Sequence, residues 1–358
     1  MAETFGRALA AAPRWKLVAA FAAVYLVWGS TYLAIRFAIE TLPPFLMAGA
    51  RFLVAGAVLY GWARLRGAPR PRLLEWRSAA VIGGMLLLGG NGGVVWAQKT
   101  VPSGVAAVLV ASEPLWIVLL DWLPPRPVRP SGRVLIGLGI GLAGVALLVA
   151  PWEASGSAVD PVGAIVIVLA AASWAAGSLY SRRAPLPGSP LAATGMQMLA
   201  GGVLLTATGL GAGEAARFDP AAVSAASLAG LAYLVVFGSL VAFTAYVWLL
   251  RHAPASQVAT YAYVNPVIAV ILGWAVAGEA LGVRTVVGAA VIVGAVALLS
   301  AVRRGGGAAR GAPAGGGTRR DVPPPPRLRP VRRAPPPAVA RAACPTCGAI
   351  SEPEAPAA

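Results

Sequence analysis

Two stretches of the chain decide its fold: residues 102–114 read PSGVAAVLVASEP, and residues 254–266 read PASQVATYAYVNP. They align without a gap, so that Glu113 and Pro114 fall on Asn265 and Pro266. Further pairs relate the segments upstream of each stretch: Trp96 and Trp248, Trp28 and Trp174, Arg36 and Arg182, Pro44 and Pro190, and Arg51 and Gln197. Matches of Trp, Pro and Arg are rarer by chance than matches of Ala, Val or Leu, so the chain is an internal duplication.

Long apolar runs surround both stretches. The 358 residues are 58% hydrophobic and 12% charged, whereas soluble domains are about 25% charged. A membrane-spanning helix needs about 20 mostly apolar residues. We therefore expect ten spans, at residues 17–35, 45–63, 78–97, 104–123, 134–150, 161–180, 191–210, 228–250, 256–277 and 283–302.

The ten expected spans divide into two repeats of five. Because five is odd, the second copy enters the membrane upside down, which is the architecture of alternating-access transporters. The predicted fold is an all-α membrane protein with a first repeat at residues 17–150 and a second at 161–302. Residues 1–16 form a cytoplasmic N-terminus, and the Pro- and Arg-rich residues 303–358 are expected to be a disordered cytoplasmic tail.

Lys and Arg concentrate in alternate loops. The positive-inside rule then places both termini in the cytoplasm of a multi-pass inner-membrane protein. This placement assigns the net charge of +16 to cytoplasmic loops and the tail. The expected partners are the lipid bilayer and a small-molecule substrate, and no nucleic acid.

Several motifs resemble one transporter family. They are WGSTY at residues 28–32, RFLVA at 51–55, VPSGVAA at 101–107, and Asn265 and Pro266 followed by Gly278 and Glu279. Over about residues 15–302 the chain resembles the drug/metabolite transporter superfamily, specifically its ten-span EamA-type exporters. The resemblance implies transport without enzymatic activity. One departure is that the Gly-Glu pair after the ninth span has no counterpart after the fourth, where residues 121–125 read DWLPP.

Glu113 is the sharpest candidate for coupling, because a charge at the centre of a span costs roughly 2.5–3.5 kcal/mol. Arg51 is its expected partner. One interpretation is that Glu113 takes up a proton in each cycle while Arg51 tunes its proton affinity. The other is a static ion pair between the second and fourth spans. Glu279 and Arg284, by contrast, are expected to form a structural pair in the last loop.

Two prolines and a polar, aromatic set predict a cavity. Pro114 and Pro266 lack an N–H, so each is expected to break its helix near the membrane midplane. Freed backbone groups at that depth are tolerated beside protein or a wet cavity. The residues expected to line a substrate cavity are Trp28, Tyr32, Asn91, Gln257, Tyr261 and Asn265. Aromatic walls with few polar groups suit small organic solutes.

The sequence therefore predicts a proton-coupled exporter of small metabolites or drugs, with an uncoupled facilitator as the alternative. An enzyme is disfavoured because HExxH and GxSxG motifs are absent and His252 is the single histidine. Cys344 and Cys347 make half of a zinc motif, and four ligands are needed for a structural site. No cofactor or metal is expected.

Overall fold

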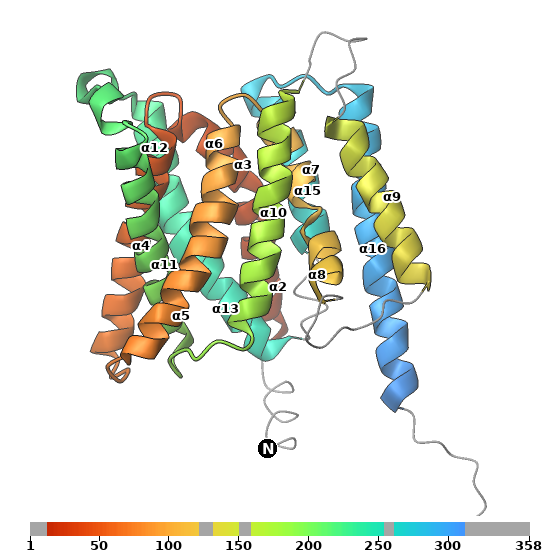
Figure 1. The fold of residues 1–358 in the computed structure, drawn as a ribbon, viewed down its shortest axis with the longest axis horizontal. Helices are drawn as coiled ribbons and strands as arrows, with labels where there is room; N and C mark the ends of the chain where they lie inside the picture. Colours follow the sequence, from red (N-terminus) through yellow and green to blue (C-terminus); the bar gives the residue numbers. More distant parts are fainter. Residues whose placement is uncertain (1–12, 122–131, 150–158, 254–260, 312–358) are drawn as a thin grey trace, which may run out of the picture. The chain divides into compact units, whose positions relative to one another are not determined.

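The computed structural model describes residues 13–121, 132–149, 159–253 and 261–311, which form helices and loops and contain no strand (Figure 1). The predicted tail from residue 312 onward, including Cys344 and Cys347, lies outside this part. The helices of the first half are α2 (Arg14–Ala22), η1 (Ala23–Val27), α3 (Trp28–Ala38), α4 (Pro44–Leu65), α5 (Leu73–Gly83), η2 (Gly84–Gly92), α6 (Gly93–Ala97), α7 (Ser103–Val110), α8 (Glu113–Asp121) and α9 (Gly132–Val149).

The second half begins with α10 (Pro161–Ser181) and α11 (Pro190–Gly211), followed by the short 3₁₀ turns η3 (Ala215–Arg217) and η4 (Pro220–Ala222). It continues with α12 (Ala225–Tyr233), η5 (Leu234–Val241), α13 (Ala242–His252), α15 (Tyr261–Ala277) and α16 (Val283–Gly311). The segments η1, η2 and η5 are π-helical stretches inside longer helices.

Within the described residues, seven helical segments are long and apolar enough to cross a membrane. They are Arg14–Ala38, Pro44–Leu65, Leu73–Ala97, Ser103–Leu120, Pro161–Ser181, Pro190–Gly211 and Ala225–Tyr246. Three shorter apolar helices, Leu135–Leu147, Val264–Ala277 and Val283–Ala295, lie within the fifth, ninth and tenth expected spans. The described residues thus form an all-helical fold whose longer helices have the length and composition of membrane spans. The last helix differs from expectation, because α16 continues past residue 302 to Gly311.

Proline and small polar caps set where several helices begin. Pro44, Pro161 and Pro190 each occupy the first turn of α4, α10 and α11. A first-turn N–H has no helical acceptor, so proline loses nothing there. Asp160 and Ser189 accept the next free N–H groups of α10 and α11 through their side chains.

Helices α4 and α11 lie side by side (Figure 1). Two pairs of glycines face across their contact. A Cβ on Gly195 would lie 2.6 Å from the backbone nitrogen of Tyr60, and one on Gly56 would lie 2.8 Å from that of Leu199. Gly49 faces Thr206 and Gly202 faces Leu53 in the same way.

These contacts are reciprocal in the register of the sequence repeat. Adding 146 to Gly49 and Gly56 gives Gly195 and Gly202, and the same shift turns the partners Tyr60 and Leu53 into Thr206 and Leu199. Each contact therefore recurs between the repeat counterparts of the same two residues. A two-fold axis relating the two halves produces this pattern. The α4–α11 pair therefore has the symmetry that inverted repeats predict.

The two predicted helix breaks have different outcomes. The fourth predicted span is interrupted, because α7 ends at Val110 and α8 begins at Glu113, one residue before Pro114. The break expected at Pro266 is absent: α15 runs continuously through it. Proline inside a helix removes one N–H donor, and a membrane helix tolerates this when neighbouring groups satisfy the freed carbonyl.

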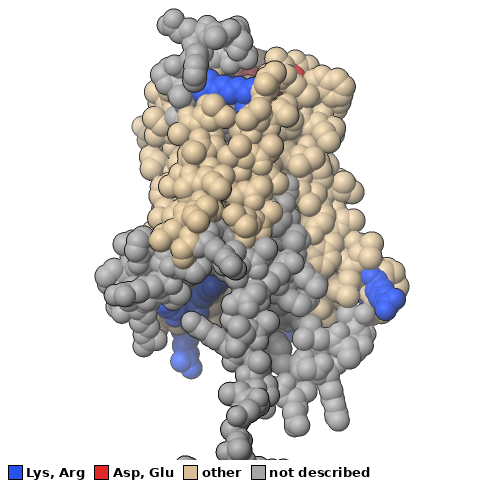
Figure 2. Space-filling view, turned by 90° about the vertical axis from the view of Figure 1, so that its right-hand side faces the viewer, with Lys and Arg blue, Asp and Glu red and all other residues tan. Residues whose placement is uncertain are grey.

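The outward faces of several helices are apolar. Exposed side chains include Val54 and Val58 on α4, Leu169 on α10 and Trp274 on α15. Figure 2 shows one such face, on which visible Lys, Arg, Asp and Glu lie toward the two ends and an uncharged band lies between them. This distribution suits contact with lipid.

Candidate functional site

A cavity of about 120 Å³ lies among the helices of both halves. Seven of the predicted site residues line it: Trp28, Tyr32, Arg51, Asn91, Glu113, Tyr261 and Asn265. The eighth, Gln257, lies outside the described residues. Residues from α3, α4, η2, α8, α10 and α15 are thereby brought to one place. Roles of these residues in binding or coupling stay predictions.

Arg51 does not pair with Glu113, although both line the cavity. Its side chain is buried, with 5% of the residue exposed, and its Nε donates to Ser239 Oγ at 2.9 Å. Its guanidinium also lies over the Phe52 ring, 4.7 Å from the centroid. The expected ion pair is therefore wrong for this structure, because a hydroxyl from η5 and an aromatic face accommodate the cation instead.

Glu113 starts α8 at the interruption of the fourth span. Within the described part of the chain its carboxylate has no ion-pair partner. Nearby, Asn91 carries a buried Oδ1 that no described group hydrogen-bonds. The cavity thus presents an acid and an amide oxygen that can accept hydrogen bonds from a proton donor or a solute.

An aromatic cluster forms one wall of the cavity around Trp28. Its ring centroid lies 5.1 Å from that of Tyr246, 5.2 Å from Tyr261 and 5.6 Å from Phe243. Trp28 Nε1 donates to the carbonyl oxygen of Gly238 at 3.1 Å. This bond satisfies the indole N–H of the half-buried Trp28 and fixes the orientation of its ring.

The π-helical stretches supply contacts that the sequence analysis missed. Gly238 and Ser239, which hold Trp28 and Arg51, belong to η5, and Asn91 belongs to η2. A π-turn shifts the hydrogen-bond pattern and frees backbone carbonyls, and such turns are frequent at functional sites. A hydropathy pattern carries no signal for them.

With the amide of Asn265 oriented to donate, its nitrogen reaches the carbonyl oxygens of Tyr261 and Tyr25, each at 3.2 Å. Tyr25 belongs to η1, so this third π-helical stretch is also tied to the site. Asn265 is buried, with 7% exposed, and binds α15 to the first helix.

The lining follows the sequence repeat. Trp28 and its counterpart Trp174 both line the cavity, as do Glu113 and Asn265. The register that pairs Trp96 with Trp248 also relates Asn91 to Phe243, which both line it. Each half therefore contributes equivalent positions to one cavity, but with different chemistry: an acid and an amide in one pair, an amide and a phenyl ring in another.

The expected pairing of Glu279 with Arg284 is wrong, because Glu279 pairs with Arg36 at 2.5 Å. Arg284 Nε instead donates to the carbonyl of Leu147 at 2.5 Å. Sequence proximity suggested the first pairing, whereas packing brings the end of α3 to the loop between α15 and α16.

Comparison with known proteins gives a family. The EamA-like transporter family matches residues 14–150 and again residues 161–301. The inner membrane transporter YedA of Escherichia coli (strain K12) is 41% identical over 285 residues, covering 79% of this chain and 90% of YedA. The transporter YvbV of Bacillus subtilis (strain 168) is 25% identical over 294 residues, covering 80% and 92%.

A solved structure described as "Crystal structure of protein" has the same fold, with a TM-score of 0.54 and 24% identity over 82% of this chain and 99% of that chain. The family matches both halves and, together with the identity to YedA, agrees with a membrane transporter rather than an enzyme. The chain belongs to the EamA-like transporter family.

Proposed function

We propose that this transporter exports small organic metabolites or drugs as a proton-coupled secondary carrier that works by alternating access. The observation that carries the proposal is a cavity lined at equivalent positions by both halves, Trp28 with Trp174 and Glu113 with Asn265. A site placed between two related halves can be opened to either side by rocking one half against the other.

The proposed architecture has ten spans in two inverted repeats, 17–150 and 161–302, with both termini in the cytoplasm. The reciprocal glycine contacts of α4 and α11 support the inversion. An inner-membrane location is supported by the similarity to the inner membrane transporter YedA. With this orientation, the loops that carry Glu214 and Glu279 face away from the cytoplasm.

The cavity chemistry favours solutes with an apolar or aromatic body and a few polar groups. Trp28, Tyr261 and Phe243 offer aromatic surface, and Asn91 offers a free acceptor. The cavity of about 120 Å³ is smaller than the roughly 300–1,000 Å³ of pockets for drug-sized ligands. We therefore expect the cavity to widen when a solute enters.

Glu113 is the proposed proton carrier. Arg51 is occupied by Ser239 and Phe52, so the carboxylate is left to bind a proton or a solute without first breaking an ion pair. Arg51, which lines the same cavity, would tune the proton affinity of Glu113 through its charge. The static ion pair considered from the sequence loses its support.

The experiment compares metabolites released by cells that overproduce the parent chain, the Glu113→Gln variant or the Glu40→Gln variant. Glu40 is an exposed glutamate outside the cavity and serves as the matched control. Solutes released by the parent are then assayed in proteoliposomes with and without a proton gradient. We expect the gradient to drive flux in the parent and in Glu40→Gln, and to have no effect in Glu113→Gln.

Gradient-dependent flux that survives in Glu113→Gln contradicts the coupling role. Flux that is equal with and without a gradient in the parent favours the alternative, an uncoupled facilitator. The two outcomes are separable because both variants and the parent are measured with the same solute.

A further inference from the structure

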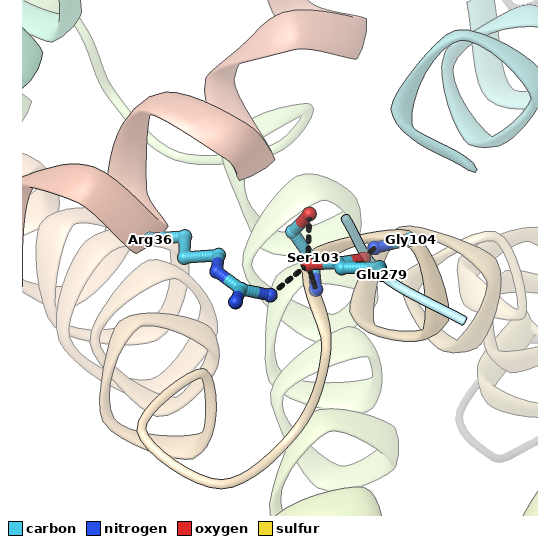
Figure 3. Close-up of polar contacts among 4 residues, drawn as sticks. All are labelled: Arg36, Ser103, Gly104 and Glu279. Carbon is cyan, nitrogen blue, oxygen red and sulfur yellow. Dashed lines mark hydrogen bonds and ion pairs between the residues drawn. The ribbon is translucent and has the colours of Figure 1, made fainter. Parts of the chain in front are cut away.

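The carboxylate of Glu279 is the centre of a four-contact cluster (Figure 3). Oε1 accepts from the backbone N–H of Ser103 at 2.8 Å, from Ser103 Oγ at 2.8 Å and from Arg36 Nη1 at 2.5 Å. Oε2 accepts from the N–H of Gly104 at 3.0 Å. The side chain of Glu279 is 7% exposed and that of Arg36 is 38% exposed, so the carboxylate is shielded from water while the guanidinium reaches the surface.

The cluster joins three elements that are distant in the sequence. Arg36 is near the end of α3, Ser103 and Gly104 form the first turn of α7, and Glu279 lies between α15 and α16. The free N–H groups at the start of α7 point at the carboxylate, where a negative charge is favoured. Glu279 therefore ties the second half of the chain to two helices of the first half.

The backbone is shaped to hold this carboxylate. A Cβ on Gly273 would lie 2.4 Å from Glu279 Oε2, so only glycine leaves room for it. The N–H of Glu279 donates to the carbonyl of Gly273 at 3.0 Å, and Gly278 between them has φ +64°. The positive φ is a conformation that favours glycine. The end of α15 thus provides the space and the backbone hydrogen bond that position the carboxylate of Glu279.

The cluster lies directly beyond the cavity along its lining helices. Arg36 is four residues from Tyr32, and Gly104 is six residues from Val110, both of which line the cavity. At about 1.5 Å per helical residue, these offsets are roughly 6 and 9 Å. The cluster therefore joins α3, α7 and the loop after α15 at one end of helices that line the cavity.

The other half of the repeat lacks the key residue. Arg36 has its counterpart in Arg182, but the register that pairs Trp96 with Trp248 places Pro127 opposite Glu279. Proline has no carboxylate, so the sequence register gives Glu279 no acidic counterpart in the first half. A symmetric carrier with one such tie is expected to favour the conformation in which that end is closed.

We propose that Glu279, with Arg36, Ser103 and Gly104, is a lock that keeps the Glu279 end of the solute path closed in the resting carrier. The proposal rests on the alternating-access function proposed above, and it adds which end is closed and what holds it. Opening this end requires the carboxylate to leave the first turn of α7 and the guanidinium of Arg36.

The test is accessibility of a cavity cysteine from each side of the membrane. Cys344→Ser and Cys347→Ser remove the native thiols, and Ala171→Cys places a reporter in the cavity lining. A separate Ala222→Cys chain marks which vesicle face carries the Glu279 end, since Ala222 is exposed in the loop between α11 and α12. A membrane-impermeant maleimide is applied to sealed vesicles of either orientation.

Glu214→Gln is the matched control for Glu279→Gln. Glu214 is buried, with 7% of the residue exposed, and its oxygens accept the N–H groups of Phe45 at 3.2 Å and Leu46 at 2.9 Å. It therefore also caps a helix from a loop of the second half. It joins α4 to the end of α11, however, and these helices already pack backbone to backbone. We therefore expect the solute path to stay closed when Glu214 is replaced.

We expect Glu279→Gln to raise the ratio of open to closed molecules at this end about tenfold, which corresponds to about 1.4 kcal/mol. Glu214→Gln should label as the parent does. Unchanged labelling in Glu279→Gln, or an equal rise in both variants, overturns the proposal.

Should Glu279→Gln fail to fold, Gly273→Ala provides the test, because its methyl group displaces the carboxylate from its position while keeping the charge. We expect it to raise labelling from the Glu279 end, and unchanged labelling would overturn the proposal. Labelling needs no transported solute, so a failure of the lock is distinguishable from an absence of flux.

Discussion

The close backbone contact between α4 and α11 makes a quantitative prediction about Gly195. A Cβ at this position would lie 2.6 Å from the nitrogen and 2.9 Å from the Cα of Tyr60. Both are backbone atoms of α4, so no side-chain rotation can relieve the contact. Gly195→Ala must instead push α4 and α11 apart. Gly61, one residue beyond Tyr60, has no atom within 4 Å of an added Cβ and is the matched control.

The magnitude follows from two opposing contributions. Overpacking a tight contact costs typically about 1–3 kcal/mol. Replacing glycine by alanine inside a helix stabilises by about 1 kcal/mol. The second contribution is common to Gly195→Ala and Gly61→Ala, so it cancels when the two variants are compared. We expect Gly195→Ala to be less stable than Gly61→Ala by about 1–3 kcal/mol.

The assay is thermal unfolding of the detergent-purified protein, followed through tryptophan fluorescence for the parent and both variants. We expect Gly61→Ala to melt at or above the parent temperature and Gly195→Ala below it. By the reciprocity of the pair, Gly49→Ala should resemble Gly195→Ala, softened because its nearest atom is the Thr206 hydroxyl, which can rotate away. Equal melting temperatures for Gly195→Ala and Gly61→Ala would refute the backbone contact between α4 and α11.

Three further predictions concern single interactions. Ser239→Ala leaves the buried guanidinium of Arg51 without its acceptor and should destabilise the protein by about 1–3 kcal/mol in the same melting assay; parent-like stability would contradict the contact. Trp28→Phe keeps an aromatic ring but removes the bond to the Gly238 carbonyl, and a loss of about 0.5–1.5 kcal/mol is expected, against no such loss for Trp174→Phe. Burial alone would raise the pKa of Glu279, but hydrogen bonds from Gly104, Ser103 and Arg36 outweigh it and lower the pKa below its ordinary 4.5. Its contribution to stability is therefore complete above about pH 4.5 and is lost as the pH falls through the lowered value, so acid melting curves should show a loss that Glu279→Gln lacks.

The positions of the helices were largely predictable because hydropathy is a local property. A run of apolar residues near 20 must leave water wherever the rest of the chain lies. The starts of α4 and α11 are also local, since Pro44 and Pro190 stand in the first turns of these helices. The end of α16 was misplaced because the tail was expected to begin at residue 303, where the composition changes, although a helix can continue beyond its apolar part.

The membership of the cavity was predictable for a similar reason. Polar groups such as Asn91 and Glu113 are costly against lipid, so their presence in apolar spans already indicated a shared interior. The hydrogen-bond and ion-pair partners of individual residues, by contrast, were not predictable. Glu113 was the partner expected for Arg51, but Arg51 donates its hydrogen bond to Ser239, which is 188 residues away in the sequence. Glu279 likewise pairs with Arg36, which is 243 residues away.

By itself the sequence determined that this protein is a duplicated, helical membrane transporter, and which few residues in its spans carry charge or hydrogen-bonding groups. The tertiary structure alone decided that Arg51 binds Ser239, that α15 continues through Pro266, and that Glu279 closes on Arg36 and the start of α7. The physical reason is the separation along the chain of the residues that each interaction joins. Burial of apolar residues and helix capping depend on neighbours in the chain, whereas a hydrogen bond between distant side chains depends on helix rotation and on π-turns, which hydropathy does not encode.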